Sequence, residues 1–207
     1  MKGLLDGCLT RANDPDPRKR FARRGITREK FEEQRLTHLF HLLYLAGHDK
    51  LDSRSQDRVR SIARKIRGSE GPSAYCNILA TLLYARCSDE SLRTLGEGLL
   101  DGRLPEALSD NGRTLPRAEL CSIFGGADGL AVWEHQSLFR PVLLTGYDEN
   151  VYEDESSPLP FVEAPVRIGR GTYATVYKVK IEEGHLIMDK ATGSAYNVSS
   201  SISRSRS

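Results

Sequence analysis

Residues 168–181 place two glycines at the start of a stretch of strand-forming residues. After Gly171 the chain alternates with a period of two and is rich in threonine, tyrosine, valine and isoleucine. This pattern favours a β-strand. In a dinucleotide-binding fold the glycines would instead open a helix whose N-terminus faces the pyrophosphate. We therefore predict that Gly169 and Gly171 lie in the loop of a β-hairpin.

The order of strand, glycine loop and strand resembles the nucleotide-covering loop of protein kinases, G-x-G-x-x-G-x-V. The corresponding positions are Gly169, Gly171, Ala174 and Val176. Glycine lets backbone amides approach phosphate oxygens, because it has no Cβ atom. Ala174 departs from the motif's third glycine and stiffens the loop. The alternative is a hairpin whose glycines only form the turn.

The resemblance implies binding of ATP with Mg²⁺. Ile168 and Val176 would form apolar walls above and below the adenine ring, and Tyr173 at the loop tip would shield the phosphates. The likeness extends over about residues 133–186, through an acidic stretch and the landmark Leu159-Pro160-Phe161. This region is similar to the segment that leads into the catalytic domain in kinase-like proteins of filamentous fungi.

A kinase also requires a lysine on its third strand to hold the α- and β-phosphates. In the strand candidate Ala195–Ser199 that place is taken by Ser199, and Lys190 is interpreted as a solvated surface residue. The sequence contains no H-R-D-x-x-x-x-N, D-F-G or A-P-E motif. We therefore expect a truncated kinase-like chain that is inactive and binds nucleotide weakly.

The region before the hairpin shows apolar residues at helical spacing, bounded by capping residues and glycines. Short connections between such helices favour a small bundle of antiparallel neighbours. The fold class is therefore mainly α, with a helical bundle followed by an acidic linker and an incomplete β-hairpin of a kinase N-lobe. The expected helices are Thr27–Ala46, Ser53–Arg67, one opened by Pro72, one beginning at Ser88, and Leu115–Phe124.

These patterns divide the chain into five segments. They are a basic, disordered arm (1–26), a helical domain (27–140), an acidic linker (141–163), a partial kinase N-lobe (164–198) and a disordered Ser/Arg tail (199–207).

The formal net charge of +2 is unevenly distributed, with a positive first half and a negative second half. Basic residues concentrate in 18–24 and in 54–67. A nuclear-import signal or a nucleic-acid face is one interpretation, and an ordinary solvated surface is the favoured one. The basic helix could also dock on the acidic residues of 148–155.

Other classes of function have little support in the sequence. The four cysteines (Cys8, Cys76, Cys87 and Cys121) lack C-x-x-C spacing and are interpreted as buried, reduced thiols of a cytoplasmic or nuclear protein. No apolar stretch is long enough to predict a membrane span. His38 and His41 lie one turn apart without a third ligand at suitable spacing, so no metal site is predicted.

Two hypotheses from different classes follow. The first is a kinase-family chain whose remaining family feature is the ATP-type glycine loop. The second is a non-catalytic helical module that binds a protein partner and happens to end in a hairpin.

Overall fold

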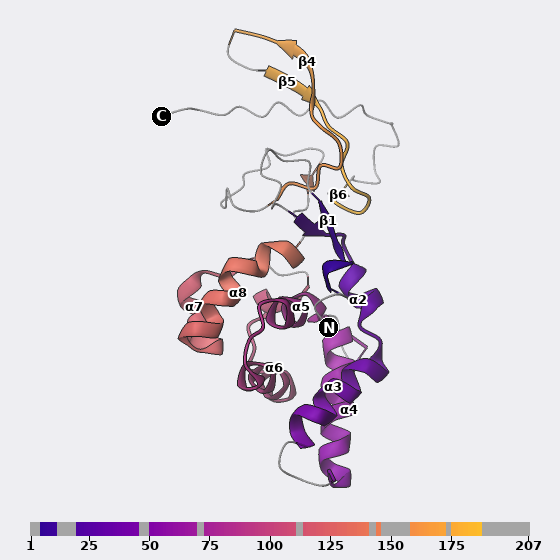
Figure 1. Cartoon of the computed structure of the whole chain (residues 1–207), viewed down its shortest axis with the longest axis vertical. Coiled ribbons are helices and arrows are strands. Elements are labelled where there is room, and N and C mark those ends of the chain that lie inside the picture. The colour runs from indigo at the N-terminus through magenta and orange to yellow at the C-terminus, as the bar shows by residue number, and fades with distance from the viewer. Residues whose placement is uncertain are drawn as a thin grey trace.

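The computed structural model describes residues 5–11, 20–45, 50–69, 73–110, 114–140, 144–145, 158–172 and 175–187. They form a helical body from which a long β-hairpin projects (Figure 1). The predicted class, mainly α, is confirmed. The helices are α2 (Ile26–Lys30), α3 (Glu33–Leu45), α4 (Ser53–Arg67), α5 (Cys76–Tyr84), α6 (Asp89–Asp101), the 3-10 helix η1 (Glu106–Leu108), α7 (Arg117–Phe124) and α8 (Gly126–Phe139). The strands are β1 (Leu9–Arg11), β2 (Arg20–Ala22), β3 (Leu144–Thr145), β4 (Val166–Arg170), β5 (Thr175–Lys178) and β6 (Leu186–Ile187).

The ends of α4 and α6 follow directly from the sequence. Asp52 accepts a hydrogen bond from the Ser55 amide, and Ser88 accepts one from the Ser91 amide, so each helix begins at a side-chain cap. Both helices end at a glycine in the left-handed region, Gly68 and Gly102, which is the conformation that such C-caps require. The predicted apolar faces are buried, with Val59, Ile62, Ala63 and Ile66 on α4 and Leu92, Leu95 and Leu99 on α6.

The single helix expected over Thr27–Ala46 is two helices, so that prediction was wrong. The chain breaks after α2 at Phe31, which is 2% exposed and belongs to the core. Thr27 is not the N-cap: Gly25 takes that position, and Thr27 is the second residue of α2. Instead the Thr27 hydroxyl is buried and donates to Asn77 Oδ1 at 2.6 Å. Core burial of Phe31 and this hydrogen bond outweigh the continuous helical pattern.

Helix α8 was not expected, because its first turn contains two glycines and reads as a loop. Here Gly129 permits a close crossing of α7 and α8. A Cβ atom at this position would lie 2.4 Å from the Cys121 Cα atom, which is closer than atoms can approach. The α8 side chains Val132, Gln136 and Phe139 are buried against the rest of the body.

The described parts of residues 1–26 differ from the disordered arm that we expected. The first few form a helical turn, and β1 and β2 form a short antiparallel pair with Leu9 opposite Ala22. Leu5, Cys8 and Ala22 are buried in the main core. Apolar residues spaced too irregularly for a helix or a long strand thus still contribute to the core.

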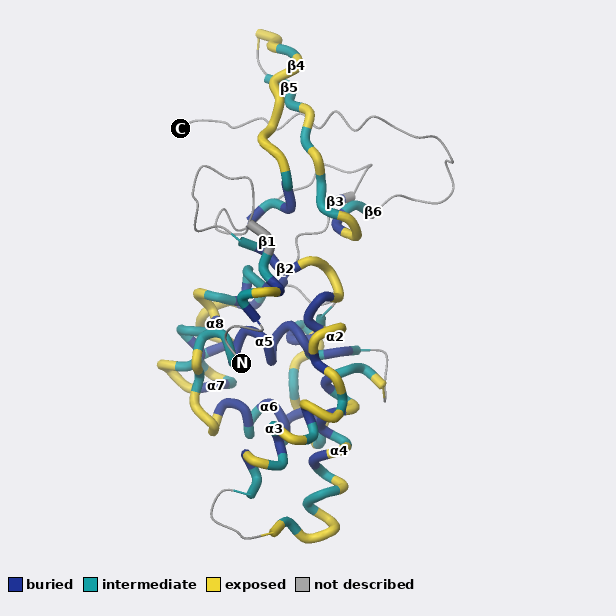
Figure 2. The backbone as a smooth tube through the Cα atoms, turned by 45° about the vertical axis from the view of Figure 1, so that its right-hand side comes forward, coloured by how far each residue is buried: buried dark blue, intermediate teal, exposed yellow. Residues whose placement is uncertain are grey.

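Helix α5 is the centre of the body. All seven residues from Cys76 to Leu82 are buried, whereas the other helices bury only one face (Figure 2). A helix buried all round cannot have its first amides capped by water. The Asp110 carboxylate supplies the partner and accepts from the Asn77 amide at 2.7 Å.

A buried side chain compensates the charge of the half-buried Asp110. Arg140, directly after α8, is 6% exposed and attracts the Asp110 carboxylate, and its Nη1 donates to the Ala107 carbonyl at 2.7 Å. Burial raises the pKa of Asp110, against the opposing effect of the Asn77 and Cys76 amides and of Arg140. Burial also lowers the pKa of Arg140 to about 10. The pair therefore ties the ends of η1 and α8 to the start of α5.

Among the described residues, no helix has both the length and the apolar composition needed to cross a bilayer.

The close crossing at Gly129 gives a matched test. We expect Gly129→Ala to lower the free energy of unfolding by about 3 kcal/mol or more, because backbone atoms must move apart. Gly126→Ala should be neutral or stabilising by up to about 1 kcal/mol, since that position is open and helical. Urea unfolding followed by circular dichroism measures both. Equal effects of the two substitutions would contradict the assignment.

The cap of α5 gives a second test. Asp110→Ala should destabilise the protein by about 2–4 kcal/mol, because it leaves buried amides without their acceptor and the buried Arg140 guanidinium without the opposite charge that compensates it. Asp110→Asn keeps one acceptor and should cost less. Asp101→Ala, an exposed acid at the end of α6, is the control and should change stability by less than about 0.5 kcal/mol.

The pH dependence of the same variants has a defined sign. Because the pKa of Asp110 is raised in the folded state, the folded protein binds this proton more tightly than the unfolded chain does, and stability is lost as the pH rises from the unfolded pKa through the folded pKa. Asp110→Asn should remove this loss. An unchanged slope of unfolding free energy against pH would show that Asp110 does not titrate in this way.

Candidate functional site

The predicted β-hairpin is present, and Gly171 begins its loop. The prediction that Gly169 also lies in the loop was wrong, because Gly169 is a paired residue of strand β4. Strands β4 and β5 are antiparallel, with Gly169 opposite Val176 and Arg170 opposite Thr175. The register shifts between Arg167 and Gly169, so Ile168 is the additional residue of a β-bulge. The bulge lies directly beside the first glycine of the motif.

The hairpin has one largely apolar face. In an antiparallel pair, residues opposite one another point to the same face, and successive residues of a strand point to alternate faces. Val176 therefore lies on the same face as the pair Val166 and Lys178. Val166 and Ile168 are 59% and 57% exposed, which is unusual for large apolar side chains. A Cβ atom built at Gly169 would contact nothing within 4 Å, so the space beside the glycine is open.

The hairpin is also cationic. Arg167, Arg170 and Lys178 are exposed, and no acidic residue occurs between Val166 and Lys178. Arg167 pairs with Tyr177, and Arg170 pairs with Thr175. These two cations therefore lie on the other face of the hairpin from Val176. An apolar face, open glycine backbone and nearby positive charge are the properties that an adenine nucleotide requires of a covering loop.

The predicted site residues are distributed as follows. The register brings Ile168, Gly169 and Val176 together, and Gly171 is exposed at the start of the loop. Tyr173 and Ala174 lie outside the described residues, as do Lys190, Ser199 and the acidic residues 148–155.

Below the loop, the two arms of the hairpin remain paired. Phe161 forms an isolated antiparallel bridge with Ile181, and the Val162 amide donates to the Lys180 carbonyl at 3.0 Å. The Glu182 amide donates to the Pro160 carbonyl at 2.9 Å. Phe161 is buried, so the predicted landmark Leu159-Pro160-Phe161 forms the base of the hairpin.

The base is fixed to the body by His185, a residue that the sequence did not single out. His185 is fully buried, and its Nε2 accepts from the Arg24 amide at 3.3 Å. Its ring lies edge-on to Phe21 of β2, with 5.3 Å between centroids. An ion pair between Arg23 and Glu182 at 3.9 Å lies beside it. The segment 20–24 thus joins the hairpin to the helical body.

The last described strand, β6, does not extend the β4–β5 hairpin as a third strand. β6 pairs in parallel with β3, with Leu144 opposite Leu186, and within the described ranges β4 has β5 as its partner. Among all the residues that the structure describes, no three histidine, cysteine or acidic side chains are grouped so as to hold a metal ion. The described hairpin therefore supplies a loop and one largely apolar face.

The cysteines agree in part with the sequence interpretation. None of the four forms a disulfide in the described structure; Cys8 and Cys76 are buried, and Cys87 and Cys121 are half-buried. Burial raises the pKa of Cys76 and of Cys87 to about 12. These two thiols are therefore poor nucleophiles and are structural.

Comparison of this chain with models of protein families, with characterised proteins and with solved structures finds no match.

The His185 joint gives a third test. We expect His185→Ala to increase hydrogen exchange of the amides of Val162 and Glu182 by about tenfold or more, because the base of the hairpin loses its packing. Exchange in α5 should be unaffected. Glu183→Ala, an exposed neighbour, is the control. Unchanged exchange at the hairpin base would show that other contacts hold it.

Proposed function

We propose that the β4–β5 hairpin is the glycine loop of a kinase-type nucleotide-binding lobe and that it covers the phosphates of ATP. The observation that supports this most directly is the register, in which Gly169 faces Val176 beside the bulged Ile168. This arrangement gives one apolar face next to open backbone, as the resemblance to kinases requires. Exposed Val166 and Ile168 would then be covered by the ligand or by the rest of such a lobe.

The proposal includes weak binding and no catalysis by this chain. In the family, the strand lysine, the Mg²⁺ ions and a second lobe supply most of the interactions with ATP and close the cleft. A hairpin offers amides and one apolar face only, so few interactions offset the entropy of capturing the ligand. Mg²⁺ would accompany ATP through its phosphates, since the described residues offer no metal-binding group.

A second proposal is that the helical body is a protein-binding module without catalytic function. Its basic α4 supports this proposal, or else a nucleic-acid or nuclear-import face, although nucleic acid is the weaker candidate. Four cysteines without a disulfide fit a cytoplasmic or nuclear location.

The nucleotide proposal is tested by titrating ATP with Mg²⁺ while recording amide chemical shifts. We expect a dissociation constant of about 1 mM, equivalent to about 4 kcal/mol, with shift changes centred on Gly169 to Val176. Gly171→Asp should abolish them, because a carboxylate in the loop repels phosphate. Gly126→Asp adds the same charge at an open position far from the hairpin and should have no effect.

Shift changes elsewhere in the protein, or changes that survive Gly171→Asp, would overturn the proposal. A dissociation constant in the low micromolar range would contradict the argument for an incomplete site. An assay with labelled ATP and generic protein substrates should show no phosphotransfer.

A further inference from the structure

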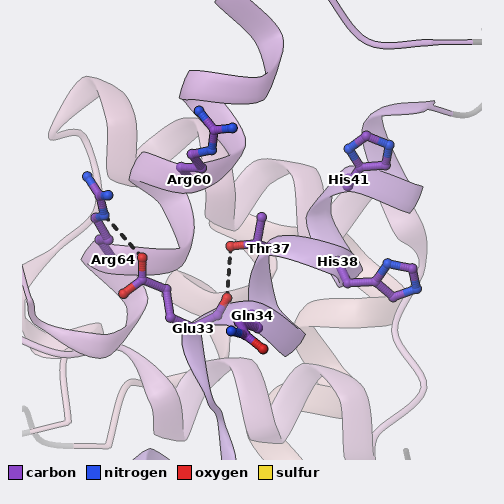
Figure 3. Close-up of a pocket in the computed structure, with 7 residues that line it drawn as sticks. All are labelled: Glu33, Gln34, Thr37, His38, His41, Arg60 and Arg64. Carbon is purple, nitrogen blue, oxygen red and sulfur yellow. Dashed lines mark hydrogen bonds and ion pairs between the residues drawn. The ribbon is translucent and has the colours of Figure 1, made fainter. Parts of the chain in front are cut away.

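A groove of about 730 Å³ lies between α3 and α4 (Figure 3). All of its lining side chains are polar or charged. They are Glu33, Gln34, Thr37, His38 and His41 of α3 and Arg60 and Arg64 of α4. In Figure 3, Arg60 and His41 stand on either side of Thr37. The groove is therefore open to a ligand that offers hydrogen-bond acceptors.

The two arginines carry the positive charge of the groove. Arg64 Nε donates to Glu33 Oε1 at 3.1 Å, and Arg60 Nη1 donates to Asp57 Oδ1 at 2.9 Å. Both pairs are solvent-exposed, and exposed ion pairs contribute only about 0–1 kcal/mol. A carboxylate from another molecule can therefore take the place of either partner at little cost, and a guanidinium binds it through two parallel hydrogen bonds.

An apolar residue lies beside these polar groups. Leu42 is 53% exposed and follows His38 by four positions, so both lie on the same strip of α3. Few large apolar side chains in the described part of the chain are so exposed. An apolar anchor next to a pair of arginines fits a peptide that combines carboxylates with an apolar side chain.

We propose that this groove, formed by the seven lining residues and Leu42, docks an acidic segment of a partner protein. Arg60 and Arg64 would bind its carboxylates, the imidazoles and Gln34 would donate further hydrogen bonds, and Leu42 would contact an apolar side chain. Nucleic acid fits less well, because Glu33 and Asp57 interrupt the positive surface that a phosphate backbone requires. This proposal rests on the second proposed function, the protein-binding helical body, and is independent of the hairpin.

The test is fluorescence anisotropy of the full chain with a labelled peptide of about twelve alternating glutamate and leucine residues. We expect saturable binding that weakens by about tenfold or more in Arg60→Ala/Arg64→Ala. Arg103→Ala/Arg117→Ala removes the same charge from exposed positions outside the groove and should change binding by less than about twofold. Leu42→Ala should weaken binding about threefold or more.

Further variants separate charge from folding. Arg60→Lys/Arg64→Lys keeps the charge and loses the paired hydrogen bonds, so its affinity should fall between those of the native protein and the double alanine variant. A peptide with glutamine in place of glutamate should bind at least about tenfold more weakly. The proposal is overturned if the peptide does not bind, if the glutamine peptide binds equally, if the control variant loses as much, or if a single-stranded or duplex oligonucleotide binds more tightly at the same salt concentration.

Discussion

The fold depends on how the start of α5 is capped inside the core. Because this helix is buried on all sides, its first amides need an acceptor from the protein, and Asp110 provides it. A carboxylate that is half-buried beside the core requires compensation in turn, which Arg140 supplies from the end of α8. One capping requirement thus fixes where α5, η1 and α8 meet, although these elements are distant in the sequence.

The outer helices are joined by weaker and more exposed polar contacts. Glu97 of α6 accepts hydrogen bonds from Tyr44 of α3 and from Arg58 of α4, so one carboxylate connects three helices. Burial, together with this hydrogen bond, raises the pKa of the Tyr44 phenol. Beside these contacts Gly96 lets α6 approach closely, since a Cβ atom there would lie 3.1 Å from Ile62 and 3.2 Å from Phe40. The α3–α4 pair is therefore held on its inner side, and its outer groove is left to solvent or a ligand.

Local signals in the sequence were sufficient where a helix or turn is determined by its own residues. The caps at Asp52 and Ser88 and the glycine-containing hairpin were predictable for this reason. Interactions between distant residues were not. The break after Phe31, the glycine-rich start of α8, and the burial of His185 each depend on a partner eight or more positions away in the chain or on core packing. The basic residues of α4 were recognised, but the groove that they form with α3 was not.

The joint at His185 determines what the hairpin can do. Its base is packed on the body through Phe21 and Arg24, whereas its apolar strand residues Val166 and Ile168 face solvent. Exposed apolar residues on a two-stranded ribbon are not explained by stability, because a lone hairpin gains nothing from them in water. They are explained if a ligand or a further part of a lobe covers this face. Under the proposed function, a base packed on the body and an exposed apolar face would suit a loop that closes over a nucleotide, and the hairpin alone would offer the ligand only that one face.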